Sequence, residues 1–184
     1  MRHALRGSEE ASLRVYVFES DEEPAIMVTV RPPADLSSPQ RLRSVGYQRP
    51  QPHLKHLATG QAFYTRLARR DGFDDALLTG PDGIVSETAS ANICFLDESG
   101  LVWPDAPQLQ GITMQLLEPQ LHRGGPSGRA LIRLRDIPHF LAAFVTNARG
   151  VAAVQQIDRL QLPVHAKQLQ ILSDAYASVP LDTI

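Results

Sequence analysis

Residues 72–96 read GFDDALLTGPDGIVSETASANICFL, and this stretch decides the fold. Two short apolar runs, 75–79 and 84–87, flank the sequence Gly-Pro-Asp-Gly, which predicts two strands joined by a tight turn. The apolar run 91–96 predicts a third strand. Glu87 closes the second run, and a carboxylate needs a partner if it is buried among strands. Taken alone, however, Glu87 is more simply explained as a solvent-facing residue at a strand end.

The sequence before this stretch predicts a hairpin and a linker. Residues 13–18 and 25–31 alternate apolar and polar side chains and are rich in valine, which is typical of paired strands. Residues 32–40 are rich in proline and serine and show no periodicity, so they predict a linker. We therefore expect three parts, covering residues 1–31, 32–40 and 41–184.

Helices and strands alternate in the rest of the chain. Residues 41–53 are expected to be extended, because their prolines bias the preceding residues away from helix. A helical apolar face runs from Leu57 to Arg70, and Gly72 follows as a stop signal. The order of elements predicts a mixed α/β or α+β fold. The remaining predicted elements are a strand at 101–103, a helix at 112–121 that Pro119 should kink or end, a loop at 122–129, a strand at 131–135, a helix at 137–144, a strand at 151–157 and a helix at about 166–177.

Composition excludes several classes of protein. The 184 residues carry a formal net charge of −2, so no basic excess supports a nucleic-acid partner. No apolar run approaches the roughly 20 residues that a membrane-spanning helix needs. Cys94 is the single cysteine, which excludes an internal disulfide and is typical of a reducing compartment. We therefore expect a cytoplasmic protein with no membrane partner, in which Cys94 is a buried structural thiol.

Lysine is scarce in this chain. Lys55 and Lys167 are the two lysines among 18 basic residues, and the other 16 are arginines. Lys55 lies in the segment PHLKHL, where apolar neighbours should desolvate the amine and favour its neutral, nucleophilic form. The alternative is an ordinary surface lysine. Lys167 begins an amphipathic helix and is expected to be solvated.

Two short segments could bind an anion through their backbone N–H groups. Gly111, Ile112 and Thr113 open a helix, and the free N–H groups of a first helical turn suit a phosphate. Asn147 and Ala148 follow an expected apolar helix, at a junction where small residues often offer backbone N–H groups to an anion. Plain helix capping and plain turn formation explain the two segments equally well.

Other chemistries lack their usual marks in the sequence. The six histidines show no metal-ligand spacing, so no metal site is expected. The glycine-rich nucleotide motifs and the serine-hydrolase motif do not occur.

Together, the residues form an ordered set that resembles the class IV aminotransferases, the fold-type-IV pyridoxal-phosphate enzymes. That family includes branched-chain and D-amino-acid aminotransferases and aminodeoxychorismate lyase. The resemblance runs from about Lys55 to Asp158. It implies the large domain of that fold, a mixed sheet or pseudo-barrel with packed helices. The matching elements, in order, are Lys55, Gly-Phe-Asp-Asp-Ala-Leu-Leu at 72–78, Asp-Gly-x-x-Ser-Glu at 82–87, Asn-Ile-x-Phe at 92–95, Gly-Ile-Thr at 111–113 and Thr-Asn-Ala at 146–148.

The resemblance assigns chemical roles to three of these residues. It implies that Lys55 bonds covalently to the aldehyde of pyridoxal 5'-phosphate and moves the substrate Cα proton. Glu87 would pair with the ring nitrogen of the cofactor, so that the ring withdraws electrons. Asn92 would support the strand that carries this carboxylate.

The same resemblance implies a phosphate site. Gly111, Ile112 and Thr113 would hold the cofactor phosphate through backbone N–H groups, with the hydroxyl of Thr113 as a further ligand. Asn147 and Ala148 occupy the place where the family uses a Thr-Ala pair near the phosphate and the substrate carboxylate.

The implied function is amino-group transfer between an amino acid and a 2-oxo acid in a homodimer. Family members also carry a small N-terminal domain that supplies an arginine to the phosphate. Its last strands match residues 13–31, so the resemblance implies an N-terminally truncated chain with a stub of that domain. A lyase, a noncatalytic remnant of the same fold and an interaction module without cofactor stay open as alternatives.

Overall fold

The chain divides into two units near the predicted linker. The first unit comprises Met1–Asp35 and Pro180–Ile184, and the second comprises Leu36–Val179. The boundary at Asp35 lies inside segment 32–40. The predicted first part, 1–31, includes residues whose structure is not described. The computed structural model describes residues 10–21, 23–57, 60–124 and 127–180.

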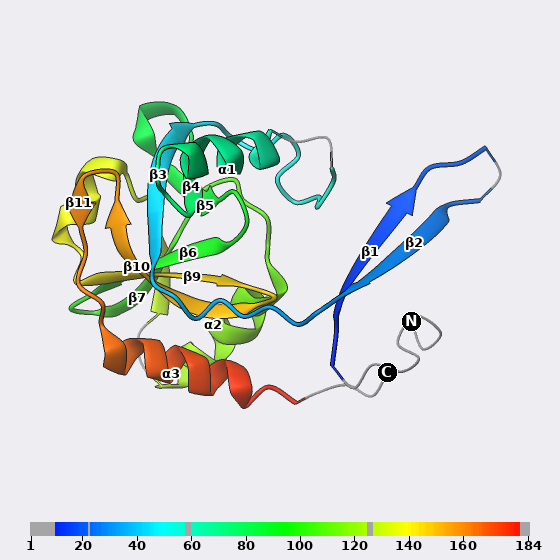
Figure 1. The fold of residues 1–184 in the computed structure, drawn as a ribbon. Helices are drawn as coiled ribbons and strands as arrows, with labels where there is room; N and C mark the ends of the chain where they lie inside the picture. The colour runs from blue at the N-terminus through cyan, green and yellow to red at the C-terminus, as the bar shows by residue number, and fades with distance from the viewer. Residues whose placement is uncertain (1–9, 22, 58–59, 125–126, 181–184) are drawn as a thin grey trace. The chain divides into compact units, whose positions relative to one another are not determined.

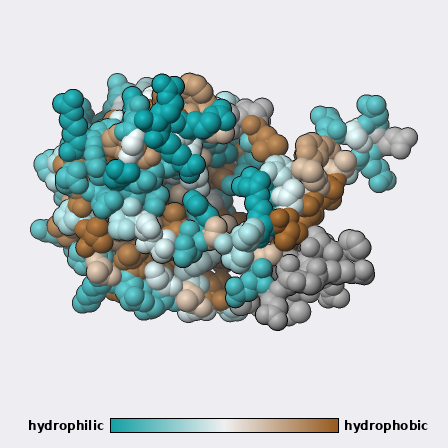
Figure 2. Space-filling view, viewed as in Figure 1, coloured by the Kyte–Doolittle hydropathy of each residue, from teal (hydrophilic) through white to brown (hydrophobic). Residues whose placement is uncertain are grey.

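The first unit is an antiparallel hairpin of β1 (Ser12–Phe18) and β2 (Ala25–Arg31), as the sequence predicts. Successive side chains of a strand point to opposite faces, so directly paired residues share a face. One face is entirely aliphatic, and its outer pair, Val17 and Ile26, is 68% and 67% exposed. Apolar side chains are visible along the hairpin in Figure 2. The pairs that form this aliphatic face are Leu13 with Val30, Val15 with Val28, and Val17 with Ile26.

The second unit is built on a nine-stranded sheet (Figure 1). Its strands follow the order β5-β4-β3-β10-β9-β6-β7-β8, and β11 pairs with β10. The pairs β3–β4, β3–β10 and β7–β8 are parallel and the others antiparallel, which confirms the mixed α/β expectation. The strands are β3 (Gln40–Gly46), β4 (Asp75–Thr79), β5 (Val85–Thr88), β6 (Asn92–Asp97), β7 (Gly100–Pro104), β8 (Ser127–Ala130), β9 (Ala142–Asn147), β10 (Gly150–Ile157) and β11 (Leu160–Gln161).

Among the described residues, three α-helices pack on this sheet: α1 (Gln61–Arg70), α2 (Ile112–Gly124) and α3 (Ala166–Ala177). The start predicted for α1 at Leu57 is wrong, because Leu57 is 72% exposed and gains no burial that would extend the helix. The predicted stop is confirmed by Gly72, whose φ of 84° suits glycine. Among the described helices, none is long and apolar enough to cross a lipid bilayer.

The central strand β9 separates two apolar clusters. Phe144 is buried with residues of α2 and α3, whereas Val145 is buried with the cluster on the opposite face. Helices α2 and α3 cover the Phe144 face of the sheet (Figure 1). Helix α1 covers a smaller cluster on β3 and β4. Packing on both faces of the sheet holds in place the strands whose ends carry the candidate site.

The sequence predictions fail between residues 119 and 144. The predicted helix at 137–144 is wrong, since a 3₁₀ helix (Leu134–His139) ends before β9 begins. A strand buried on both faces has a continuous apolar run, which periodicity alone does not distinguish from a buried helix. The strand expected at 131–135 is also wrong, because β8 begins inside the predicted loop at Ser127 and ends at Ala130. Of the two effects expected of Pro119, a kink or an end, the end is wrong, because helix α2 continues to Gly124.

Candidate functional site

Glu87 is the buried carboxylate of the candidate site. It lies on β5, with 3% of its surface exposed. The Nε of Arg49 donates a hydrogen bond to Oε1 of Glu87 over 3.0 Å, and Arg49 is itself only 7% exposed. The backbone N–H of Tyr47 donates to the carbonyl of Thr79, which holds the segment before Arg49 beside β4. The sequence-based explanation of Glu87 as a solvent-facing residue is therefore wrong.

Burial raises the pKa of Glu87 above its ordinary value. The charge and hydrogen bond of Arg49 oppose this effect, as do the N–H of Leu109 and the charge of Lys55, but burial prevails. The Leu109 N–H reaches Oε2 over 3.4 Å, which is a long hydrogen bond. Because a carboxylate offers about four acceptor sites, Oε2 can accept a further donor.

Lys55 lies in the loop between β3 and α1. Its side chain is exposed, and the neighbouring Leu54 and Leu57 are 46% and 72% exposed. The expectation that apolar neighbours desolvate this amine is therefore wrong, because both leucines face solvent instead of covering it. Lys55 still lies close enough to Glu87 for its charge to lower the pKa of that carboxyl.

Asn92 fixes the loop that leads to α2. It is 4% exposed, and its Nδ2 donates to the carbonyl of Leu109 over 2.7 Å and to Oε1 of Gln108 over 3.0 Å. Gln108 in turn donates to the carbonyl of Pro104 over 2.7 Å. A Cβ atom at Gly111 would lie 2.1 Å from Oδ1 of Asn92, so only glycine fits there. The loop before α2 thus contacts both Glu87 and Asn92, and Gly111 lies in it.

The first turn of α2 follows Gly111. The side chain of Ile112 is 71% exposed, whereas Thr113 is 3% exposed. The first backbone N–H groups of a helix have no partner within the helix, and α2 carries no acidic residue in its first turn. Thr146, which is paired with Asn92 in the sheet, has a fully buried hydroxyl without a partner among the described residues.

Asn147 and Ala148 lie at the reversal between β9 and β10. Oδ1 of Asn147 accepts the N–H of Arg149 over 2.8 Å, which is ordinary turn chemistry. Its Nδ2 donates to the carbonyl of Ser90 over 3.2 Å. This bond brings Asn147 to the turn between Glu87 and Asn92. Ala148 is exposed in the turn and offers only its backbone.

Reasoning from the sequence missed Arg49, Gln108 and the N–H of Leu109. The signal for Arg49 was partial, since a buried carboxylate requires a donor or a cation. With 16 arginines in the chain, only the folded structure shows which one meets Glu87.

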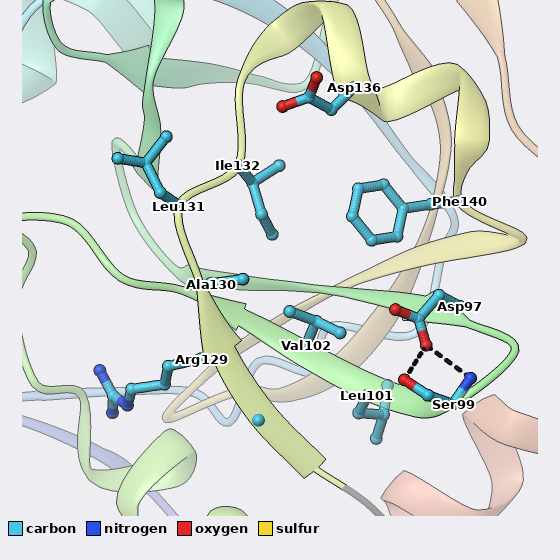
Figure 3. Close-up of a pocket in the computed structure, with 11 residues that line it drawn as sticks. Asp97, Ser99, Leu101, Val102, Arg129, Ala130, Leu131, Ile132, Asp136 and Phe140 are labelled. Atoms are coloured by element: carbon cyan, nitrogen blue, oxygen red, sulfur yellow. Dashed lines mark hydrogen bonds between the residues drawn. The ribbon is translucent and has the colours of Figure 1, made fainter.

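The second unit also has a cavity of about 440 Å³ (Figure 3). Asp97, at the other end of β6 from Asn92, lines it together with Ile132 and Phe140. The two ends of β6 are about 17 Å apart at the usual rise per residue. The hydroxyl of Ser99 lowers the pKa of Asp97, aided by backbone N–H groups. None of the residues predicted for the site lines this cavity.

Comparison with known proteins places the fold. The chain is similar to a solved structure assigned as a 4-amino-4-deoxychorismate lyase from Legionella pneumophila, with 19% identity and a TM-score of 0.81 over 95% of this chain and 74% of that one. It is also similar to a hypothetical aminotransferase from Mycobacterium tuberculosis solved in a PLP-bound form, with 19% identity and a TM-score of 0.81 over 96% of this chain and 70% of that one. These likenesses confirm the expected fold-type-IV architecture.

Sequence comparison leads to the same family. A probable branched-chain-amino-acid aminotransferase from Rickettsia felis is 34% identical over 97 residues, which cover 52% of this chain and 33% of that protein. The match thus spans about a third of the length of that curated relative. The family model described as amino-transferase class IV matches residues 3–157, well over half of the chain. The chain therefore belongs to the class IV aminotransferase family.

Proposed function

We propose that this chain binds pyridoxal 5'-phosphate through Lys55 and Glu87 and transfers amino groups between an amino acid and a 2-oxo acid. The observation that carries the proposal is the buried Glu87 carboxylate. Its Oε1 is held by Arg49 and its Oε2 can accept a further donor. An exposed lysine lies within electrostatic reach of the same carboxylate.

The residues around Glu87 fit this cofactor. The lack of a side chain at Gly111 lets the first turn of α2 lie directly against Asn92. The first-turn N–H groups of Ile112 and Thr113 can then bind a phosphate. The unpartnered hydroxyl of Thr146 lies on the strand beside Asn92, where a polar ligand would satisfy it. We assign cofactor binding to residues 41–184, with 1–31 as part of a second domain and 32–40 as the linker.

When bound, the cofactor supplies an aldehyde that bonds to amines and a ring that withdraws electrons from the substrate Cα. Oε2 of Glu87 would accept a hydrogen bond from the ring nitrogen and favour its protonated form. Nζ of Lys55 provides the covalent anchor. As a free amine, Lys55 would take the proton from the substrate Cα and deliver a proton to the carbon that carried the cofactor aldehyde. Asn147 and Ala148 would border the phosphate and the substrate carboxylate. We also propose a cytoplasmic homodimer.

Borohydride trapping tests the cofactor assignment. Purified chain incubated with pyridoxal phosphate and then reduced should carry the cofactor mass on the peptide that contains Lys55. The variant Lys55→Gln should lose this label, whereas Lys167→Gln provides the matched control and should keep it. Label on Lys167, or no label on either lysine, would overturn the assignment. Exchange of amino groups between amino and 2-oxo acids then tests the activity.

A lyase is the second candidate function, favoured by the likeness to the Legionella structure. A lyase releases its product without a 2-oxo acid acceptor, whereas a transaminase without an acceptor stops after its first half-reaction. Incubating unreduced, cofactor-loaded protein with 4-amino-4-deoxychorismate and no acceptor separates the two. If neither reaction occurs in protein that carries the cofactor on Lys55, the chain is a noncatalytic binding form of the fold.

A further inference from the structure

We infer that Asp75 is a positioning residue that holds the turn between Glu87 and Asn92 in place for cofactor binding. This inference rests on the proposed function, but it concerns contacts made entirely within the second unit. Asp75 lies on β4 and is 6% exposed. Among the described residues, no ion pair includes it, so neutral donors alone solvate its carboxylate.

The carboxylate of Asp75 accepts hydrogen bonds from two separate segments. Its Oδ1 accepts the hydroxyl of Thr65 on α1 over 2.8 Å. Its Oδ2 accepts the hydroxyl of Thr88 over 2.9 Å and both the hydroxyl and the N–H of Ser90, over 2.7 and 3.1 Å. Hydrogen bonds to a charged group are stronger than those between neutral groups. Asp75 therefore ties the turn to α1 and β4.

The turn is further closed on itself. The N–H of Thr88 donates to the carbonyl of Ala91 over 2.8 Å, and the N–H of Ala91 donates to Oγ1 of Thr88 over 2.9 Å. Glu87 directly precedes this turn and Asn92 directly follows it. A displacement of the turn would consequently move both side chains.

A third predicted site residue depends on the same turn. Asn147 donates to the carbonyl of Ser90, whose N–H and hydroxyl both bind Asp75. One buried carboxylate thus supports three strands that carry predicted cofactor contacts. A residue needed for stability alone would not have to bind the particular turn that links these contacts.

Two variants test the inference, Asp75→Ala and Ser90→Ala. Ser90→Ala is the milder change, so it still tests the inference if Asp75→Ala fails to fold. We expect the backbone N–H of residue 90 to exchange with solvent at least tenfold faster in Asp75→Ala, where it loses its hydrogen bond to a charged group. The increase should be smaller in Ser90→Ala, which removes only the bond of the hydroxyl. We also expect the titration midpoint of the Glu87 carboxyl, followed by ¹³C NMR without cofactor, to fall toward 4.5 as burial is lost. The affinity for pyridoxal phosphate should fall at least tenfold.

Two further variants separate positioning from general stability. Asp75→Asn keeps an oxygen that can face Ser90. It should therefore show the titration midpoint of Glu87 found in the wild type, and its affinity for pyridoxal phosphate should stay within about threefold of the wild type. Asp74→Asn changes the adjacent, exposed carboxylate, which binds Arg41. This variant should alter neither the Glu87 midpoint nor the affinity for pyridoxal phosphate. A lower melting temperature with an unchanged Glu87 midpoint in both alanine variants would overturn the inference. If the wild type binds no cofactor but the midpoint still shifts, the proposed function fails and the positioning role stands.

Discussion

At the scale of single residues, the Arg49–Glu87 pair dominates the electrostatics of the candidate site. Both side chains are buried, and removing one partner of a buried pair leaves an uncompensated charge. We expect Arg49→Met to lower the free energy of unfolding by about 3–5 kcal/mol. In the double variant with Glu87→Gln, the loss should be smaller than the sum of the two single losses. Urea unfolding of the four proteins measures this coupling.

The exposed pair of Arg41 and Asp74 provides the control for this cycle. Their side chains are 44% and 38% exposed, so Arg41→Met should cost at most about 1 kcal/mol. Equal losses for Arg41→Met and Arg49→Met would show that burial does not decide the strength of the pair.

Gly111 carries a second residue-scale prediction. A methyl group there would meet Oδ1 of Asn92 at 2.1 Å, which forces the loop or the asparagine to move. We expect Gly111→Ala to lower the free energy of unfolding by about 1–3 kcal/mol, the usual cost of overpacking. Gly46→Ala is the matched control, since a Cβ there meets nothing within 4 Å. Thermal unfolding of both variants gives the comparison, and equal melting temperatures would contradict the prediction.

At the scale of elements, the β1–β2 hairpin has an aliphatic face that its own two strands leave exposed. Exposed strand edges and apolar patches promote self-association. We expect the double variant Val17→Thr and Ile26→Thr to elute later than the wild type at high concentration in size-exclusion chromatography. Thr29→Ser lies on the other face and should leave the elution unchanged. A wild type that stays monodisperse and monomeric at all concentrations would contradict this.

The same scale shows where local sequence patterns suffice. The predicted strand at 75–79 and the helix at about 166–177 agree with β4 and α3, because turn residues bound the first and a clear periodicity marks the second. Strand β9 was mistaken for a helix because its residues from Ala142 to Thr146 are all buried. Its type depends on the neighbours β6 and β10, which the local sequence does not contain.

At the scale of the whole molecule, stability should depend on the protonation of Glu87. The folded state raises the pKa of this group above 4.5, so the folded state holds the proton more tightly than the unfolded state. Its contribution to stability is therefore complete below about pH 4.5 and is lost as the pH rises through the folded pKa. The free energy of unfolding of the wild type and of Glu87→Gln can be measured from pH 4 to 8. We expect the difference, wild type minus variant, to decrease as the pH rises. A difference that increases with pH would contradict the sign.

The sequence by itself determined the family, most of the strands and the residues that carry the resemblance, because those features are local patterns in a fixed order. Lys55, Glu87 and Gly111 were all identified in this way, and their roles toward a cofactor stay proposals. Only the tertiary structure decided that Glu87 is buried against Arg49, that Lys55 is exposed and that Asp75 supports the turn beside them. Burial and hydrogen-bond partners arise from residues far apart in the chain, and the free energy of a charge depends on those surroundings.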